Sequence, residues 1–224
     1  MIEITNVKTF NFEGSIRGMR NPMNSWDKSD SGYQQIIIDG HFDGVEFIIG
    51  PNDLSLMKKL IKSGSDHRKF MRQIFVSMDI NAPLYWWKEF DTYKVGTAAN
   101  SCSTMHTIHK KEFELDDFSH EHLTLYDVDG EICRDWLGDL EDLIDDLNLA
   151  RELFLKTKDK KYWYQMIQLL PTSYNQKRTV TLNYENLINM YHARENHKLD
   201  EWRTFCDRIE SMPYAKELIC DVFV

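Results

Sequence analysis

Alternating apolar and polar positions predict β-structure in the first third of the chain. Residues 2–12, IEITNVKTFNF, alternate and are rich in β-branched and aromatic side chains, which favours a strand. The glycine, asparagine, proline and serine residues of 14–32 are typical of a long loop. Residues 35–50, QIIIDGHFDGVEFIIG, contain two apolar runs joined through Asp-Gly turns and predict a hairpin. A further alternating run at 70–80 predicts another strand.

Helical spacing dominates much of the rest of the chain. Residues 51–64 predict a helix that begins at Pro51, is capped by Asn52 or Asp53 and ends at Gly64. For the run PLYWWKEFDTYKV, at 83–95, a strand is an alternative, but we favour a helix with an aromatic face. Further helices are expected at 135–158, at 160–170, at 183–194 and at 198–212.

The segment between these helical regions is irregular. Residues 96–126 show little periodicity and many polar side chains, so we expect a long loop that has a functional role or is ordered by a partner. No repeat or low-complexity linker divides the sequence. The pattern therefore predicts a single α+β domain over residues 1–224, with a mixed sheet and flanking helices.

Composition and charge narrow the classes of function. The chain has 224 residues, 42% of them hydrophobic, and can bury a substantial core. Its 27 basic and 36 acidic residues give a net charge of −9, which opposes broad contact with nucleic acid or an anionic membrane surface. The sequence has neither a run of about 20 apolar residues nor the pattern of a secretory signal. We expect a cytoplasmic protein that binds neither nucleic acid nor membrane.

Cysteine and histidine positions do not predict a metal centre. The four cysteines lack any Cys-x-x-Cys pair, and we expect reduced thiols at Cys102, Cys133, Cys206 and Cys220. The histidines between 106 and 122 are too dispersed for a convergent ligand set and are interpreted as surface residues. The sequence DVDGE, at 127–131, resembles the start of a calcium loop, but its glycine comes too early and no acid completes the loop. It predicts a turn.

The helix predicted at 183–194 carries an unusual number of amide groups. Asn183 and Arg194 are three turns apart on one face, with Asn186 and Met190 between them. Asparagine offers both a donor and an acceptor to the imide edge of a heterocycle, and arginine binds a carboxylate or phosphate in a bidentate manner. Such a face suits a long polar ligand, while a solvated helix face is the simpler alternative.

Two segments resemble the flavin-dependent thymidylate synthases. Residues 169–203, LLPTSYNQKRTVTLNYENLINMYHARENHKLDEWR, are similar to the family's leucine-proline helix stop, extended segment, asparagine-rich helix, arginine and Glu-x-Arg helix. Residues 64–96, GSDHRKFMRQIFVSMDINAPLYWWKEFDTYKVG, resemble the stretch from the family's Glu-His helix start to its Arg-His-Arg signature. The resemblance implies a flavin-dependent thymidylate synthase-like fold.

The chain departs from the family at several cationic positions. Thr92-Tyr93-Lys94 stands in place of the Arg-His-Arg signature. Strict spacing then places Cys102 at the position of the family's serine, whereas one inserted residue, the register that we favour, places Ser103 there. Three family arginines are replaced, and these positions hold Met105, Ile167 and Glu185. A dianionic phosphate needs local cations in a protein of this net charge, so the remaining basic residues are the candidates for phosphate binding. They are Lys94, Arg194, Lys88, Arg17 and Arg20.

The resemblance also implies roles for individual residues. It assigns catalysis to Arg194 and Ser103, cofactor binding to Ser63, Asp66, His67, Tyr93, Lys94, Asn183 and Asn189, and substrate binding to Glu89, Ser103 and Arg194. It assigns no residue to a metal. Other interpretations remain for some of these: His67 as part of a helix start, and Ser103 as an ordinary loop hydroxyl. The neighbouring Trp86 and Trp87 are a platform for a flat ring or, more often for tryptophans, part of the core.

The activity that the resemblance implies is one-carbon transfer to a pyrimidine nucleotide. FAD would be the cofactor, methylenetetrahydrofolate and NADPH the cosubstrates, and dUMP or a related nucleotide the acceptor. The enzyme would work as a homo-oligomer, a tetramer in the resembled family. The alternative is a non-catalytic, homo-oligomeric module of the same fold that binds a nucleotide or flavin.

Overall fold

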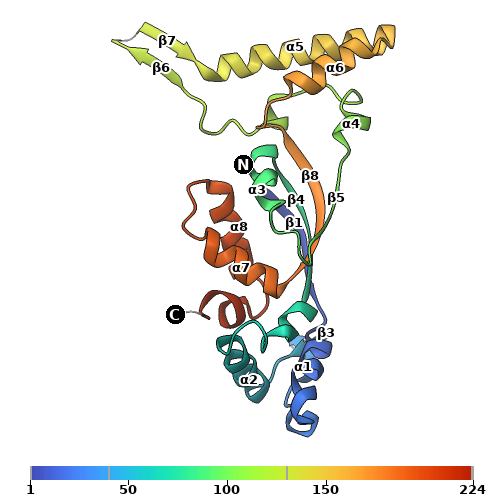
Figure 1. The fold of residues 1–224 in the computed structure, drawn as a ribbon, viewed down its shortest axis with the longest axis vertical. Helices are drawn as coiled ribbons and strands as arrows, with labels where there is room; N and C mark the ends of the chain where they lie inside the picture. The colour runs from blue at the N-terminus through green and yellow to red at the C-terminus, as the bar shows by residue number, and fades with distance from the viewer. Residues whose placement is uncertain (1, 40, 130, 223–224) are drawn as a thin grey trace. The chain divides into compact units, whose positions relative to one another are not determined.

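The computed structural model describes residues 2–39, 41–129 and 131–222 and has the predicted α+β composition (Figure 1). The strands are β1 Glu3–Phe10, β2 Gly32–Ile38, β3 His41–Ile48, β4 Phe75–Pro83, β5 Ala98–Ser101, β6 Leu125–Val128, β7 Glu131–Asp135 and β8 Asn175–Asn183. The helices are α1 Phe12–Arg20, α2 Pro51–Lys62, α3 Leu84–Phe90, α4 Thr104–Thr107, α5 Trp136–Thr157, α6 Lys160–Leu169, α7 Tyr184–Arg194 and α8 Asp200–Glu210. Short helical turns complete the described chain at Asn21–Met23, Trp26–Lys28, Lys69–Gln73, Leu115–Asp117 and Lys216–Cys220.

The chain folds into two compact units. The first contains the chain up to Glu3 together with Ile80–Thr92 and Asn100–Thr179, and the second contains Ile4–Asp79, Tyr93–Ala99 and the chain from Val180 onward. A four-stranded sheet has the order β1-β4-β8-β5, and each of its strands contributes residues to both units. The pairs β2-β3 and β6-β7 are antiparallel hairpins.

In the first unit, α5 and α6 lie side by side and share a core (Figure 1). Leu140, Ile144 and Leu147 are buried at the spacing of one helix face, as the periodicity predicted. The Asp135 carboxylate accepts a hydrogen bond from the Gly138 N–H at 2.9 Å, and Lys158 ends the helix in the left-handed conformation. These two caps explain why the observed helix agrees so closely with the predicted one.

The tryptophans of α3 belong to the core of this unit. Both Trp86 and Trp87 are fully buried, and the Trp87 indole donates a hydrogen bond to the Gln176 carbonyl at 2.8 Å. The Arg178 guanidinium lies 4.1 Å from the centre of the Trp87 ring and donates to Asp91 at 2.7 Å. The core interpretation is therefore confirmed. The helix is shorter than the predicted 83–95 and ends at Phe90.

The prediction of a loop at 14–32 is wrong, because much of the segment forms α1. Ile16 and Met19 are buried on its inner face, and the Ser15 hydroxyl donates to the Phe70 carbonyl at 3.0 Å. Two of the glycines that suggested a loop serve close packing instead: a Cβ at Gly14 would lie 2.3 Å from the Asn11 Oδ1 atom, and a Cβ at Gly18 would lie 2.6 Å from the Gln73 Oε1 atom. In α1, glycine therefore marks a crowded helix face rather than a turn.

A buried ion pair joins α1 to α2. The Arg20 Nε atom lies 2.6 Å from the Asp53 Oδ1 atom, and both side chains are almost completely buried. Neither Asn52 nor Asp53 is therefore the cap of α2 that the sequence predicted. The cap comes from Asp30 instead, whose carboxylate accepts hydrogen bonds from the N–H groups of Asn52 and Asp53 at 2.8 and 3.0 Å. Gly64 follows the end of the helix with a φ of 100°, as expected.

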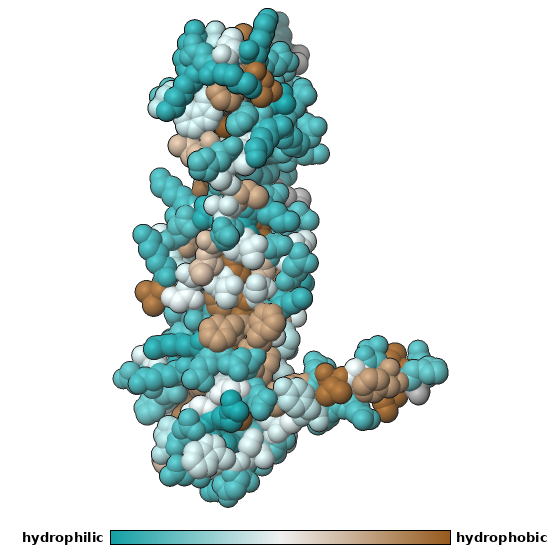
Figure 2. Space-filling model, turned by 90° about the vertical axis from the view of Figure 1, so that its right-hand side faces the viewer, coloured by the Kyte–Doolittle hydropathy of each residue, from teal (hydrophilic) through white to brown (hydrophobic). Residues whose placement is uncertain are grey.

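The hairpin predicted at 35–50 is confirmed as β2-β3, and it forms an arm with an exposed apolar face. Directly opposed residues include Ile37 with Phe42 and Gln35 with Val45. Ile37 is 63% exposed, Phe42 is 65% exposed and Val45 is 58% exposed, although all three are apolar. Figure 2 shows brown, hydrophobic side chains gathered on the arm.

The segment at 96–126 is only partly a loop, since it contains β5, α4 and a helical turn. The β6-β7 hairpin that follows was not predicted. Its turn includes Asp129, whose φ is 55°, so the predicted turn in DVDGE is confirmed for the described residues, while Gly130 lies outside them. Strands of four and five residues are too short for a clear alternation pattern, which is why sequence analysis missed them.

The two C-terminal helices are confirmed and pack together. The Tyr191 hydroxyl of α7 donates to the Glu210 carboxylate of α8 at 2.5 Å. Burial and this carboxylate raise the pKa of Tyr191 far above its usual value. Burial also raises the pKa of Cys206 to about 12 and that of Cys220 to about 11, so both thiols stay protonated at neutral pH. All four cysteines are free, as predicted.

Within the described part of the chain, no helix is both long enough and apolar enough to cross a bilayer.

Because the Arg20–Asp53 pair is buried, we predict a large loss of stability when Arg20 is replaced. In Arg20→Ala the buried Asp53 carboxylate loses its counter-ion, and we expect the free energy of unfolding to fall by about 3–5 kcal/mol. The matched control is Arg17→Ala on the same helix, since Arg17 is exposed and forms only a loose pair with Glu13 at 3.8 Å. We expect a change within about 0.5 kcal/mol there. Urea unfolding of both variants measures the difference, and equal losses would contradict this role of the pair.

The environment of Asp53 also predicts that part of the free energy of unfolding is lost in acid. Burial by itself would raise the pKa of this carboxyl, but hydrogen bonds from Ser29, Ser31 and Arg20 outweigh it and hold the pKa below its usual value. Its stabilisation is therefore complete above the ordinary carboxyl pKa of about 3.9 and is lost as pH falls through the lower folded value. Unfolding free energies measured from neutral pH into acid should fall less steeply for Asp53→Asn than for the wild type. Parallel curves would show that Asp53 is not a source of the acid sensitivity.

Candidate functional site

Most of the residues predicted for the site belong to the second unit. They lie on the turn after α2, on the segment before β5, and on β8 and α7. These residues are Ser63, Asp66, His67, Tyr93, Lys94, Asn183, Asn189 and Arg194. Glu89 and Ser103 belong to the first unit.

Asn183 sits at the junction between β8 and α7 and caps the helix. Its side-chain oxygen accepts a hydrogen bond from the Asn186 N–H at 3.0 Å, and the Asn186 side-chain oxygen accepts one from the Asn183 N–H at 3.2 Å. This reciprocal pair is a capping box built from two asparagines. Asn183 is only 6% exposed, and its side chain stabilises the start of α7 in addition to any contact with a ligand.

The segment that follows Tyr93 is held directly against this cap. The Asn186 Nδ2 atom donates to the Val95 carbonyl at 2.6 Å. Gly96 has a φ of 76°, and a Cβ there would lie 2.8 Å from the Asn183 Nδ2 atom. A side chain at this position would meet both backbone strain and a clash. Gly96 therefore allows the segment to approach α7 closely, and this brings Tyr93 to the helix.

Arg194, at the last turn of α7, is held by two aromatic rings. Its Nε atom donates to the Tyr93 hydroxyl at 3.0 Å. The guanidinium lies 4.8 Å from the centre of the Trp202 ring and 5.7 Å from that of Tyr93. These cation–π and hydrogen-bond contacts fix the plane of a half-buried, permanently charged group. A positioned guanidinium of this kind can orient a carbonyl or an anion.

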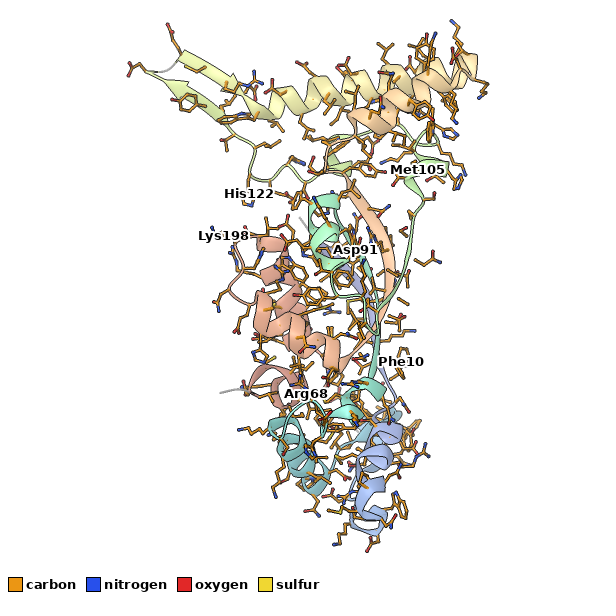
Figure 3. The ribbon with its side chains drawn as sticks, in the orientation of Figure 1. Phe10, Arg68, Asp91, Met105, His122 and Lys198 are labelled. Atoms are coloured by element: carbon orange, nitrogen blue, oxygen red, sulfur yellow. The ribbon has the colours of Figure 1, made fainter. Side chains whose placement is uncertain are left out.

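Glu185 introduces a negative charge near the start of the same helix. The Arg68 Nε atom lies 3.1 Å from the Glu185 Oε1 atom, and an Arg72 nitrogen lies 3.8 Å from it. Glu185 is 8% exposed, and its Oε2 atom is buried without a hydrogen-bond partner. Arg68, labelled in Figure 3, is thus largely neutralised by a side chain of its own unit. This pair was not predicted, because the partners are far apart in sequence.

The turn after α2 places its predicted residues at the surface. Ser63, Asp66 and His67 are exposed, and the Ser63 hydroxyl donates back to the Lys59 carbonyl at 2.8 Å. The His67 N–H donates to the Gly64 carbonyl at 3.1 Å, which fits the interpretation of His67 as part of a turn. The turn is connected to α7 through the next residue, Arg68, rather than through the predicted ones.

Glu89 and Ser103 have local partners within the first unit. Glu89 is half-buried on α3, and its carbonyl accepts a hydrogen bond from the Thr92 hydroxyl at 2.7 Å. The Ser103 hydroxyl caps α4 by accepting a hydrogen bond from the His106 N–H at 3.2 Å. The simpler interpretation of Ser103 as a local hydroxyl is therefore structurally sufficient, and its role towards a ligand stays a prediction.

The structure brings Tyr93, Asn183 and Arg194 to one helix, whereas Lys94 and Asn189 are exposed. Sequence analysis missed Trp202 as the platform for Arg194, although the apolar spacing of the last helix does predict burial at that position. Among the residues that the structure describes, no group of three or more histidine, cysteine or acidic side chains is arranged to hold a metal ion.

Comparison with known proteins gives matches at the level of structure. No protein-family model matches the chain. No curated protein matches it by sequence. The structure of thymidylate synthase X (ThyX) from Helicobacter pylori with FAD and dUMP is 16% identical, covers 99% of this chain and 99% of its own, and has a TM-score of 0.66. A second structure of the Helicobacter pylori enzyme with FAD and dUMP is 17% identical, covers 98% and 99%, and has the same TM-score of 0.66.

A methylase with a different stated substrate range shares the same architecture. The UMP/dUMP methylase PolB from Streptomyces cacaoi, bound to 5-Br dUMP, is 14% identical, covers 100% of this chain and 94% of its own, and has a TM-score of 0.60. Identities this low establish the fold alone. Over its full length the chain therefore has the fold of the flavin-dependent thymidylate synthase ThyX and of PolB, as the resemblance in sequence predicted.

Proposed function

We propose that this protein is a divergent methylase of pyrimidine nucleotides of the flavin-dependent thymidylate synthase type. It would transfer a one-carbon unit from methylenetetrahydrofolate to dUMP or a related pyrimidine nucleotide, with NADPH as reductant. The observation that carries the proposal is the arginine fixed by two rings at one end of α7, with an asparagine cap at the other. This is the helix where the resemblance in sequence expects the flavin and the nucleotide.

The residues around α7 fit the ring of FAD better than its diphosphate. Arg194 and the exposed amide of Asn189 offer hydrogen-bond donors to the edge of a flat heterocycle, and Tyr93 supports the arginine. Asn183, Asn189 and Arg194 would contact the flavin or the nucleotide, and Tyr93 would lie at the junction of the two. The chemistry that FAD supplies when bound is hydride transfer. Glu185, in contrast, would repel a phosphate placed beside it.

Cations for the phosphates are fewer than the sequence suggested. Arg20 is not available for a ligand, because it is buried against Asp53. Lys94 and Lys88 are exposed, and we propose that Lys94 contacts a phosphate of the cofactor or the nucleotide. An ammonium group acts as a point charge and lacks the planar fork of arginine, so phosphate binding should be weaker and strongly dependent on salt.

The remaining predicted residues would have supporting roles. Ser63, Asp66 and His67 are at the surface and free of the core, and we propose that they lie beside the flavin. Glu89 and Ser103 would contact the pyrimidine or its phosphate. Arg194 would polarise a ring carbonyl during turnover. Its guanidinium is already oriented, so it loses little conformational entropy when a ligand binds.

We further propose that the protein works as a homo-oligomer, with a tetramer as the expected form. The apolar face of the β2-β3 arm supports this, because Ile37, Phe42 and Val45 are exposed together on a two-stranded hairpin. Such hairpins are marginally stable alone, and exposed apolar patches mark interaction surfaces. Sedimentation velocity of the full chain measures the oligomeric state, and a monomer would contradict the proposal.

A non-catalytic module that binds a nucleotide or flavin is the second candidate function. Two observations favour it: Arg68 is neutralised by Glu185, and the Asn183 amide is engaged in a helix cap. Fluorescence titration with FAD, followed by assays of methylenetetrahydrofolate-dependent turnover with dUMP and UMP, separates the candidates. Binding without turnover supports the module, and the absence of FAD binding would contradict both flavin-dependent versions.

We predict that Arg194→Ala weakens FAD binding and turnover but leaves the fold intact. We expect FAD affinity and turnover to fall by about tenfold or more, since a positioned cationic donor is removed. The control is Arg208→Ala on α8, where the exposed arginine donates to the Ser211 hydroxyl at 3.4 Å. Equal effects of the two replacements on FAD titration and turnover would show that Arg194 has no special role.

Replacement of Asn183 separates its two tasks. Serine also caps helices, so Asn183→Ser should leave the stability nearly unchanged, whereas Asn183→Ala should lower the free energy of unfolding by about 1 kcal/mol. Both variants lose the amide and should bind FAD more weakly. Urea unfolding and FAD titration give the two readouts. Wild-type FAD affinity in Asn183→Ser would leave this residue as a helix cap alone.

A further inference from the structure

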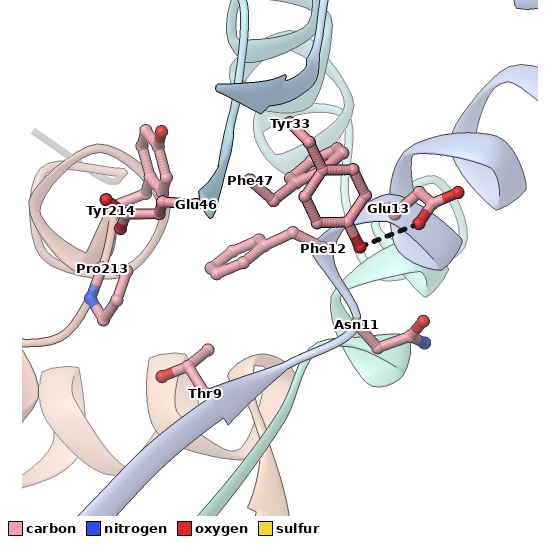
Figure 4. A pocket seen from close by; sticks show the side chains of 9 residues that line it. All are labelled: Thr9, Asn11, Phe12, Glu13, Tyr33, Glu46, Phe47, Pro213 and Tyr214. Carbon is pink, nitrogen blue, oxygen red and sulfur yellow. Dashed lines mark hydrogen bonds between the residues drawn. The ribbon is translucent and has the colours of Figure 1, made fainter. Parts of the chain in front are cut away.

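A small cavity in the second unit lies at the base of the β2-β3 arm, where β1 meets α1 (Figure 4). Its volume is about 260 Å³, which is below the roughly 300–1,000 Å³ of pockets for drug-sized ligands. It is separate from the residues assigned above to flavin or nucleotide. Its lining consists of Thr9, Asn11, Phe12, Glu13, Tyr33, Glu46, Phe47, Pro213 and Tyr214.

Aromatic rings form much of the wall and hold one another in place. The Phe12 and Tyr214 ring centres are 5.5 Å apart at an interplanar angle of 74°, and those of Tyr33 and Phe47 are 5.2 Å apart at 75°. Edge-to-face pairs of this geometry are favourable and fix the orientation of each ring. Tyr33 and Phe47 are also directly opposed across the hairpin. The rings therefore form a pre-organised wall rather than a loose cluster.

Tyr214 is held in the cavity by an unusual backbone conformation. Its φ is 55°, which is rare for a large aromatic residue. The Tyr214 hydroxyl accepts a hydrogen bond from the Ile49 N–H at 2.9 Å, and this contact ties the ring to the end of β3. The surrounding structure thus stabilises a strained residue whose ring faces the cavity.

The two carboxylates of the cavity differ in their partners. Glu13 receives a hydrogen bond from the Tyr33 hydroxyl at 3.2 Å, lies 3.8 Å from Arg17, and sits in the first turn of α1, where the helix dipole favours an anion. The Glu13 hydrogen bond and charge raise the pKa of Tyr33, so this phenol stays neutral. The backbone of Glu46 pairs with Gln34 in the hairpin, but in the described residues its carboxylate has no hydrogen-bond or ion-pair partner. In Figure 4, Glu46 reaches toward Tyr214.

The residues that line the cavity favour a ligand of positive charge. None of the nine lining residues is basic, so phosphates, carboxylates and nucleotides would meet two carboxylates and otherwise uncharged side chains. A positive group gains from both features, because carboxylates attract it and the faces of aromatic rings bind cations. We propose that this cavity binds a small organic cation, an alkylammonium or quaternary ammonium compound, with Glu46 as its counter-ion. Phe12, Tyr33, Phe47 and Tyr214 supply the surrounding rings.

Two probes of the same shape test the charge requirement. Choline is a quaternary ammonium alcohol, and 3,3-dimethyl-1-butanol is its neutral carbon analogue. Isothermal titration calorimetry on the full-length protein should show saturable binding of choline in the millimolar range and no saturable binding of the neutral analogue. Added sodium chloride should weaken the interaction, since Glu46 is exposed. Absence of choline binding, or equal binding of the two probes, would overturn the proposal.

Variants on the arm test the assigned residues. Glu46→Gln removes the free charge at nearly constant shape and should weaken choline binding by about tenfold. Asp43→Asn is the matched control, because Asp43 is an exposed carboxylate on the same strand that does not line the cavity. Phe47→Leu keeps an apolar wall without its π face and should also weaken binding. Choline affinity that falls equally in Glu46→Gln and Asp43→Asn would reduce the effect to general charge and contradict a specific site. FAD titration of the same variants should be unchanged, so this test is independent of the proposed methylase activity.

Discussion

The start of α7 is the constraint on which much of the second unit depends. Four consecutive residues there contact three other parts of the chain. Asn183 faces Gly96, and Asn186 donates to the Val95 carbonyl. Between them, the Tyr184 N–H donates to the Ile74 carbonyl at 3.0 Å, and Glu185 pairs with Arg68. One helix terminus therefore orders the candidate site because its unsatisfied backbone and side-chain groups require partners.

This arrangement also explains why the site is only partly like that of a typical nucleotide enzyme. The same amides that suit a heterocycle are used to build the helix cap, and the acid at Glu185 takes up the positive charge of Arg68. Arg194 remains as a cation whose plane is fixed by Tyr93 and Trp202. The chain thus has the fold of ThyX and PolB, while the charges of Glu185 and Arg68 beside α7 are paired with each other.

The β2-β3 arm shows a second theme, in which a part of the chain outside the proposed flavin site carries its own chemistry. The β2-β3 arm combines an exposed apolar face with a base that contains aromatic rings and a free carboxylate, Glu46. Net charge by itself gives no hint of this, because a total of −9 does not say where an acid lacks a partner. The local pairing of charges, rather than their sum, determines which ligand each surface can accept.

The sequence by itself determined the elements with strong periodicity and local caps. Helix α5 agrees with its prediction because Asp135 and the apolar spacing act within a few residues of each other. Tertiary structure alone decided the roles of Gly18, Asp53 and Glu185, since their partners lie far along the chain. Gln73 packs closely against Gly18, Arg20 forms an ion pair with Asp53, which the sequence predicted as a helix cap, and Arg68 pairs with Glu185 on α7. Spacing along a chain reports only neighbours in sequence, whereas ion pairs and close packing depend on distance in space.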